Sequence, residues 1–128
     1  MILTKLVPYN DIKKQLDKKN KIGIVSCNSC AKICGTGGEK EMVQLSERLK
    51  KEKYSVVDTD LIGAPCMINQ LKKDELKGDT TIVLACVSGI YNLKKIFPKK
   101  KIIPGLKTIG LAAIDKNNKP RLIKRLED

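Results

Sequence analysis

The residues best suited to chemistry in this chain are its five cysteines, three of which lie within eight positions. Cys27, Cys30 and Cys34 follow the spacing Cys-x2-Cys-x3-Cys, and Cys66 and Cys86 come later. Because the chain contains no histidine, a site for a soft metal would have to be built from sulfur. Ligation by thiolates alone suits an iron–sulfur cluster or a structural zinc ion. The spacing therefore predicts a metal or cluster site.

Two later cysteines compete to be the fourth ligand of such a site. Cys66 follows Pro65, whose ring fixes the local backbone and would stiffen the approach of a ligand. Cys86 ends an apolar stretch, where a buried free thiol is common. A cubane cluster needs only four cysteines, so one of these two is enough. Cys66 is the favoured fourth ligand because of the proline before it. Cys86 is interpreted as a thiol near the site, with ligation as its alternative role.

A glycine-rich turn, made of Gly35, Thr36, Gly37 and Gly38, follows the cysteine cluster. Its backbone amides are suited to cradle a phosphate at the start of a helix, or to donate hydrogen bonds to cluster sulfides and ligand sulfurs. It matches neither a Walker loop nor Gly-x-Gly-x-x-Gly. We predict that the turn contributes to cofactor binding. Because it carries no bulky side chain, we also expect a partner protein to dock over it.

No acid–base pair predicts catalysis by this chain. Without histidine the usual general base is missing, and Asp58 and Asp60, two positions apart, belong to no recognisable catalytic pair. We therefore expect an electron carrier that makes and breaks no substrate bonds. Two alternatives stay open: a structural four-cysteine zinc module that folds a docking surface, and a thiol enzyme in which Cys86 is the nucleophile.

The composition predicts a single cysteine-rich domain over residues 1–128 in the cytoplasm. A chain of 128 residues, 41% of them hydrophobic, is long enough to bury a core without disulfides. It has no apolar run long enough to span a membrane, and the apolar run at its start is too short for a signal peptide. The odd number of cysteines argues against a disulfide framework and so favours reduced thiols.

The formal net charge of +12 raises the question of an anionic partner. The basic residues are mostly lysines in short runs along the chain, and aromatic residues, which would stack on bases, make up only 3%. No helix-turn-helix or RNA-binding signature is present. We therefore interpret the charge as a solvated lysine-rich surface or as a match for an acidic protein, and not as a nucleic-acid site.

Alternating apolar patterns predict the elements that must position the cysteines. The pattern predicts strands at residues 21–26, 54–59, 80–85 and 101–103, and helices at 11–20 (with Asn10 as N-cap), 39–52, 67–78 and 88–97. Residues 108–114 and 121–126 read as a terminal hairpin. This order favours an α/β fold: an open, mainly parallel sheet with flanking helices and a C-terminal hairpin. Because ligands gather at the carboxyl ends of such strands, we expect the cysteines to share that edge.

Residues 1 to about 111 resemble a known family, the small cysteine-rich subunit or C-terminal domain associated with methylenetetrahydrofolate reductase in anaerobic bacteria such as acetogens. The resemblance is carried by Ile2-Leu-Thr-Lys5, Cys27-Asn-Ser-Cys30, Cys34-Gly-Thr-Gly-Gly-Glu-Lys40, Ala64-Pro-Cys66, Leu84-Ala-Cys86-Val-Ser-Gly89 and Pro104-Gly-Leu106. Family members commonly continue into a second Cys-x2-Cys-Gly-x-Cys segment, whereas no cysteine follows Cys86 here.

The resemblance implies an iron–sulfur protein, sometimes described as zinc-binding. Its partner would be a flavin-containing barrel subunit that reduces methylenetetrahydrofolate to methyltetrahydrofolate. On the family pattern the ligands are Cys27, Cys30, Cys34 and Cys66, and Cys86 lines the site. We therefore expect an accessory electron-transfer subunit with one [4Fe–4S] cluster, partnering a flavoprotein of this kind or a related redox complex in one-carbon metabolism.

Overall fold

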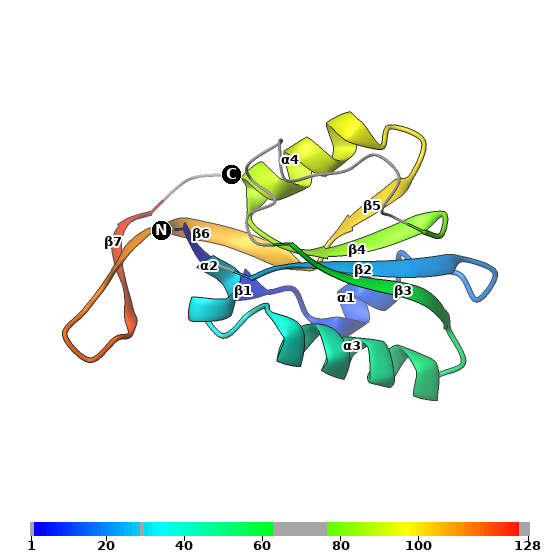
Figure 1. Cartoon of the computed structure of the whole chain (residues 1–128), viewed down its shortest axis with the longest axis horizontal. Helices are drawn as coiled ribbons and strands as arrows, with labels where there is room; N and C mark the ends of the chain where they lie inside the picture. The colour runs from blue at the N-terminus through cyan, green and yellow to red at the C-terminus, as the bar shows by residue number, and fades with distance from the viewer. Residues whose placement is uncertain (1, 29, 63–76, 126–128) are drawn as a thin grey trace.

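The centre of the protein is a parallel sheet, seen in a computed structural model that describes residues 2–28, 30–62 and 77–125 (Figure 1). Its strand order is β3-β2-β4-β5, and every neighbouring pair is parallel. The bounds are β2 Lys21–Cys27, β3 Ser55–Ile62, β4 Thr80–Leu84 and β5 Lys101–Pro104. The two central strands are buried almost throughout, because their apolar runs are covered on both faces.

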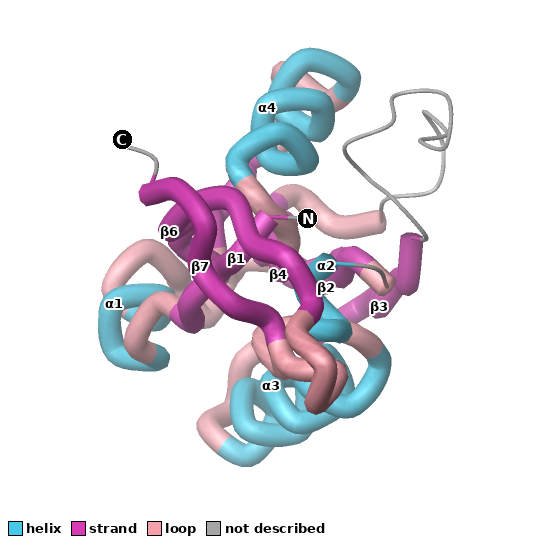
Figure 2. The backbone as a smooth tube through the Cα atoms, turned by 90° about the vertical axis from the view of Figure 1, so that its left-hand side faces the viewer, coloured by secondary structure: helices cyan, strands magenta, loops and turns pink. Residues whose placement is uncertain are grey.

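Helices cover both faces of this sheet. α3 (Glu39–Lys51) lies on one face and α4 (Val87–Ile96) on the other, as Figures 1 and 2 show. In α3 the residues Met42, Ser46 and Leu49 share one buried face at helical spacing. Acidic residues occupy its first turn and basic residues its last, which is the favourable arrangement for the helix dipole. Two short helices, α1 (Tyr9–Lys13) and α2 (Cys30–Ile33), complete the helices of the described residues.

A second, antiparallel sheet stands beyond the carboxyl ends of the parallel strands (Figure 1). Its order is β1-β6-β7, with bounds β1 Ile2–Leu6, β6 Leu106–Ile114 and β7 Pro120–Arg125. The predicted terminal hairpin is therefore present as β6 and β7. It belongs to a separate sheet, because β1 pairs with the other edge of β6. β1 is a strand that was not predicted from the sequence.

The α/β class and the parallel sheet are confirmed, and several boundaries differ from the prediction. The predicted helix over residues 11–20 is wrong in extent, and its N-cap is Pro8, so Asn10 lies inside the helix. After α1 the Asp17 carboxylate accepts a hydrogen bond from the Lys19 amide, and the Asn20 side chain accepts one from the Asp17 amide. Such local bonds compete with helix formation. The helix predicted at 67–78 falls largely outside the described residues.

The strand order creates a switch point between β2 and β4. The chain places β3 on one side of β2, and β4 with β5 on the other side. In doubly wound sheets the crevice at the carboxyl ends of the two strands at such a point is the usual ligand site. The arrangement therefore directs attention to the residues that directly follow β2 and β4.

Candidate functional site

Two cysteines flank the switch point. Cys27 is the last residue of β2 and is 6% exposed, while Cys86 is the N-cap of α4, two residues after β4 ends. Ser26 and Leu84 are paired in the parallel ladder between the two strands. Both cysteines therefore lie at the carboxyl edge of the sheet, Cys27 at the end of β2 and Cys86 just after the end of the adjacent strand β4.

The other two described cysteines belong to α2, which directly follows β2. Cys30 is its first residue, and the Cys34 amide donates a hydrogen bond to the Cys30 carbonyl. The Cys34 thiol lies 3.7 Å from the Ile2 carbonyl oxygen of β1, to which it donates. Both cysteines are half-buried. The expectation that the cysteines share one edge is therefore confirmed for these four; Cys66 lies outside the described residues.

A chain of threonines connects the two cysteine segments. The Thr36 and Thr4 hydroxyls share a hydrogen bond of 2.6 Å between their oxygens, and both residues are buried. Thr4 pairs with Thr108 across the β1–β6 ladder, and the Thr108 hydroxyl accepts a hydrogen bond from the Val87 amide at 2.9 Å. Thr36 lies two residues after Cys34, and Val87 directly follows Cys86. The strands β1 and β6 therefore hold the Cys34 segment and the Cys86 segment at a fixed distance from each other.

The glycine-rich turn is packed inside the protein. Its four amides already have acceptors: Gly35 donates to the Lys32 carbonyl, Thr36 and Gly37 to that of Ala31, and Gly38 to the Ser26 hydroxyl at 2.7 Å. A Cβ on Gly37 would lie 2.7 Å from the Ala31 Cβ and 2.9 Å from the Ser26 oxygen. Thr36, Gly37 and Gly38 are buried, and Gly35 alone of the four is exposed. Close packing therefore explains these glycines, and the expectation that a partner docks over the turn is not supported by its burial.

The cysteine thiols at this edge are suitable ligands for a metal ion or cluster. The described side chains, however, are not close enough together to form a metal site. No three cysteine, aspartate or glutamate side chains among residues 2–28, 30–62 and 77–125 gather closely enough to hold a metal ion. The four described cysteines are not joined by disulfides. The predicted fourth ligand, Cys66, is outside this set. The ligand set Cys27, Cys30, Cys34 and Cys66 therefore stays a prediction, as does the placement of Cys86 near the group.

A second polar cluster, which the sequence analysis missed, joins α1 to the end of α3. The Tyr9 hydroxyl donates to the Glu52 carboxylate, and the Lys13 ammonium lies 2.8 Å from the same carboxylate. Hydrogen bonds from Lys13 and then from Tyr9 hold the pKa of Glu52 below its usual value. Burial, followed by the bond to Glu52, raises the pKa of Tyr9. The partners are too far apart in the chain for spacing to reveal the cluster.

The helices of the described part of the chain are too short or too polar to cross a membrane. No model of a known family, no curated protein and no solved structure matches this chain.

Proposed function

We propose that the chain is an accessory electron-transfer subunit in which Cys27, Cys30, Cys34 and Cys66 hold a [4Fe–4S] cluster. One observation carries the proposal: three of these cysteines, Cys27, Cys30 and Cys34, lie with Cys86 at the switch-point edge of a doubly wound sheet, where ligands ordinarily bind. A bound cluster would supply one-electron transfer, and its potential would depend on burial and on hydrogen bonds to its sulfurs.

The residues of the chain have distinct roles in this proposal. Cys27 is held at the end of a buried strand, so its thiol has little freedom to move. The contacts of β1 and β6 with the loops after β2 and β4 hold the cysteine segments together and cover the edge from one side. Cys86, at the start of α4, lines the site without being required for ligation.

The family resemblance extends this proposal to a partner. We propose that the subunit exchanges electrons with a flavoprotein, of which a flavin-dependent methylenetetrahydrofolate reductase is the leading candidate. The net charge of +12 would favour encounter with an acidic surface on that protein. The isolated chain is then expected to show no turnover with folate substrates and to co-purify with a flavoprotein.

The deciding experiment is metal analysis of the full chain purified without oxygen. We expect a brown protein that contains iron and acid-labile sulfide, with an EPR signal after reduction. Serine at Cys27, Cys30, Cys34 or Cys66 should remove or strongly reduce iron and absorbance, whereas Cys86→Ser should keep both.

Three outcomes would change the proposal. A colourless protein with stoichiometric zinc would replace the electron carrier with a structural zinc module. Full iron in Cys66→Ser, together with loss in Cys86→Ser, would exchange the two residues in the ligand set. Protein that retains neither metal under anaerobic conditions would overturn the metal site altogether.

A further inference from the structure

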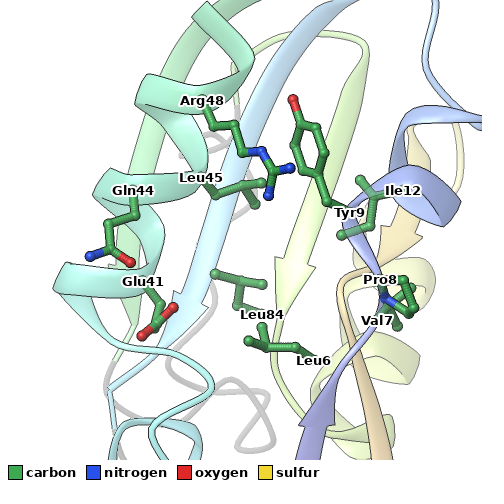
Figure 3. A pocket seen from close by; sticks show the side chains of 10 residues that line it. All are labelled: Leu6, Val7, Pro8, Tyr9, Ile12, Glu41, Gln44, Leu45, Arg48 and Leu84. Atoms are coloured by element: carbon green, nitrogen blue, oxygen red, sulfur yellow. The ribbon is translucent and has the colours of Figure 1, made fainter.

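A cavity of about 390 Å³ lies between α3 and the segment that joins β1 to α1 (Figure 3). This volume is near the lower end of the roughly 300–1,000 Å³ typical of small-molecule sites. One wall is the α3 face that carries Glu41, Gln44, Leu45 and Arg48. The opposite wall includes Tyr9 and Ile12, and Leu84 closes the cavity at the sheet.

The α3 wall carries an acidic residue, Glu41, and a basic residue, Arg48, at opposite ends of one stripe. Glu41, Gln44, Leu45 and Arg48 stand at positions i, i+3, i+4 and i+7, so they form one stripe along the helix. Glu41 and Arg48 are two turns apart, which corresponds to about 10 Å along the helix axis. The cavity therefore has an acidic end and a basic end, with Leu45, Ile12 and Leu84 lining its apolar part.

Arg48 is the cation available to a ligand in this cavity. Its guanidinium carbon lies 3.7 Å from the centroid of the Tyr9 ring, which orients the group by cation–π stacking (Figure 3). Neither of the ion pairs found among the described residues includes it. The neighbouring Glu52 carboxylate is already bound by Lys13 and Tyr9. Arg48 adds only a weaker electrostatic attraction to that carboxylate, after the hydrogen bonds from Lys13 and Tyr9. Because Arg48 is exposed, its planar donors can bind an external carboxylate.

We propose that this cavity binds a small amphipathic carboxylate, whose anionic group pairs with Arg48 and whose apolar body packs on Leu45, Ile12 and Leu84. Glu41 fixes the orientation, because its half-buried carboxylate repels an anion at the other end of the cavity. The proposal uses no cysteine and does not depend on the proposed metal site.

The test compares three probes of one shape: 3-phenylpropionate, its neutral amide 3-phenylpropionamide and the cation 3-phenylpropylamine. Each is titrated into the full-length ¹⁵N-labelled chain, and Kd is taken from the shifts of backbone amide signals around the cavity. We expect the carboxylate to bind about fivefold more tightly than the amide, equivalent to about 1 kcal/mol for a partly exposed charge pair, and the amine to bind least.

Two variants and one control identify the site. Arg48→Gln should abolish the preference for the carboxylate over the amide. Lys50→Gln removes an equal charge from the same exposed end of α3 but lies outside the cavity lining, so it should keep the preference. Gln44→Trp places a bulky side chain from an exposed position at the cavity and should weaken all three probes.

Equal Kd values for the carboxylate and the amide would overturn the proposal, as would an equal loss of preference in Arg48→Gln and Lys50→Gln. Shifts confined to residues away from the cavity, or no binding by any probe, would do the same. Iron and zinc content is measured on the same samples. Metal content tests the cysteine site and probe affinity tests the cavity, so failure of one proposal leaves the readout of the other unchanged.

Discussion

At the scale of single residues, Glu52 links α1 to the end of α3. Its carboxylate accepts from Tyr9 and Lys13, and its backbone carbonyl accepts from Lys18. Tyr9 in turn lies beneath the cations of Arg48 and Lys13. Loss of this one carboxylate would leave the Tyr9 hydroxyl and the Lys13 ammonium without their acceptor.

The lowered pKa of Glu52 makes part of the stability dependent on pH. A carboxyl whose pKa is lower in the folded state stabilises the protein above its unfolded pKa, and this stabilisation is lost as pH falls through the folded value. We therefore expect Glu52→Gln to lower the free energy of unfolding at pH 7, and the difference from the parent to shrink as pH is lowered below the usual pKa of 4.5 to about 3.

Urea unfolding followed by circular dichroism at the two pH values measures this difference. Glu47→Gln serves as a control, because Glu47 is exposed and lies in α3, five residues before the C-cap Glu52. A pH-independent difference between Glu52→Gln and the parent would show that the effect comes from packing and not from the charge.

Residues that are close in sequence can be predicted to lie together, whereas residues joined only by packing cannot. Cys27, Cys30 and Cys34 are close in sequence, so their shared location could be predicted directly. Tyr9 and Glu52 are brought together only by the packing of α1 against α3, and neither has a neighbour in sequence that signals the contact. The buried state of Gly37 was likewise hidden, because it depends on Ser26 and Ala31 lying directly against it.

At the scale of elements, β1 is attached to the loop after α2 through the pair Thr4 and Thr36. Thr4→Val removes one partner of a buried bond and should cost about 1 kcal/mol, since the remaining hydroxyl loses an acceptor or donor. In the double variant Thr4→Val/Thr36→Val both polar groups are gone, so the cost should be less than the sum of the single costs.

Chemical denaturation of the two single variants and the double variant completes this cycle. Strict additivity would indicate that the two hydroxyls do not interact. Thr59→Val, an exposed change in β3, is a control for the intrinsic effect of replacing threonine in a strand.

Gly110 allows β6 and β7 to pair closely. A Cβ at this position would overlap the Lys124 carbonyl oxygen and crowd Leu122 and Arg125. We expect Gly110→Ala to destabilise the hairpin by about 1–3 kcal/mol, the usual range for forced overpacking. Hydrogen exchange should show faster exchange in β6 and β7 and unchanged protection in β2 and β4.

Ala113→Ser changes an exposed residue of the same strand and should stay within about 0.5 kcal/mol of the parent. If Gly110→Ala left the exchange of both hairpin strands unchanged, the close approach at this position would be refuted.

How well each element could be predicted depends on how local its signal is. Residues 22–25 and 82–85 are continuous apolar runs, so β2 and β4 were found directly. The polar stretch Asp115 to Lys119 marked the hairpin turn, where the Asp115 carboxylate accepts from the Asn117 and Lys119 amides. β1 is only five residues long and its partner lies at the other end of the chain, so nothing near it signalled a sheet.

At the scale of the whole molecule, positive charge is in large excess over negative charge. The chain has 26 basic and 14 acidic residues, and two ion pairs are found among the described residues. Like charges that repel one another destabilise the compact state. Raising the ionic strength from about 0.01 M to about 0.15 M shortens the Debye length from about 30 to about 8 Å. We therefore expect the thermal midpoint to rise over this range.

Scanning calorimetry in sodium chloride, repeated in sodium perchlorate, checks this prediction. A rise common to both salts identifies screening, because specific anion binding would differ between chloride and perchlorate. A midpoint that falls with salt would show that attractive charge interactions outweigh the repulsion.

The pairing of β1 with β6 has a consequence for how the chain is made. Leu6 pairs with Leu106, so β1 waits during synthesis for a strand that lies about 100 residues later in the chain. At about 5–20 residues per second, that delay is roughly 5–20 seconds. By then β2, β3 and β4 have been synthesised, and the cysteine-bearing edge has no β6 beside it. During translation that edge is therefore open to solvent until β6 is made and β1 pairs with it.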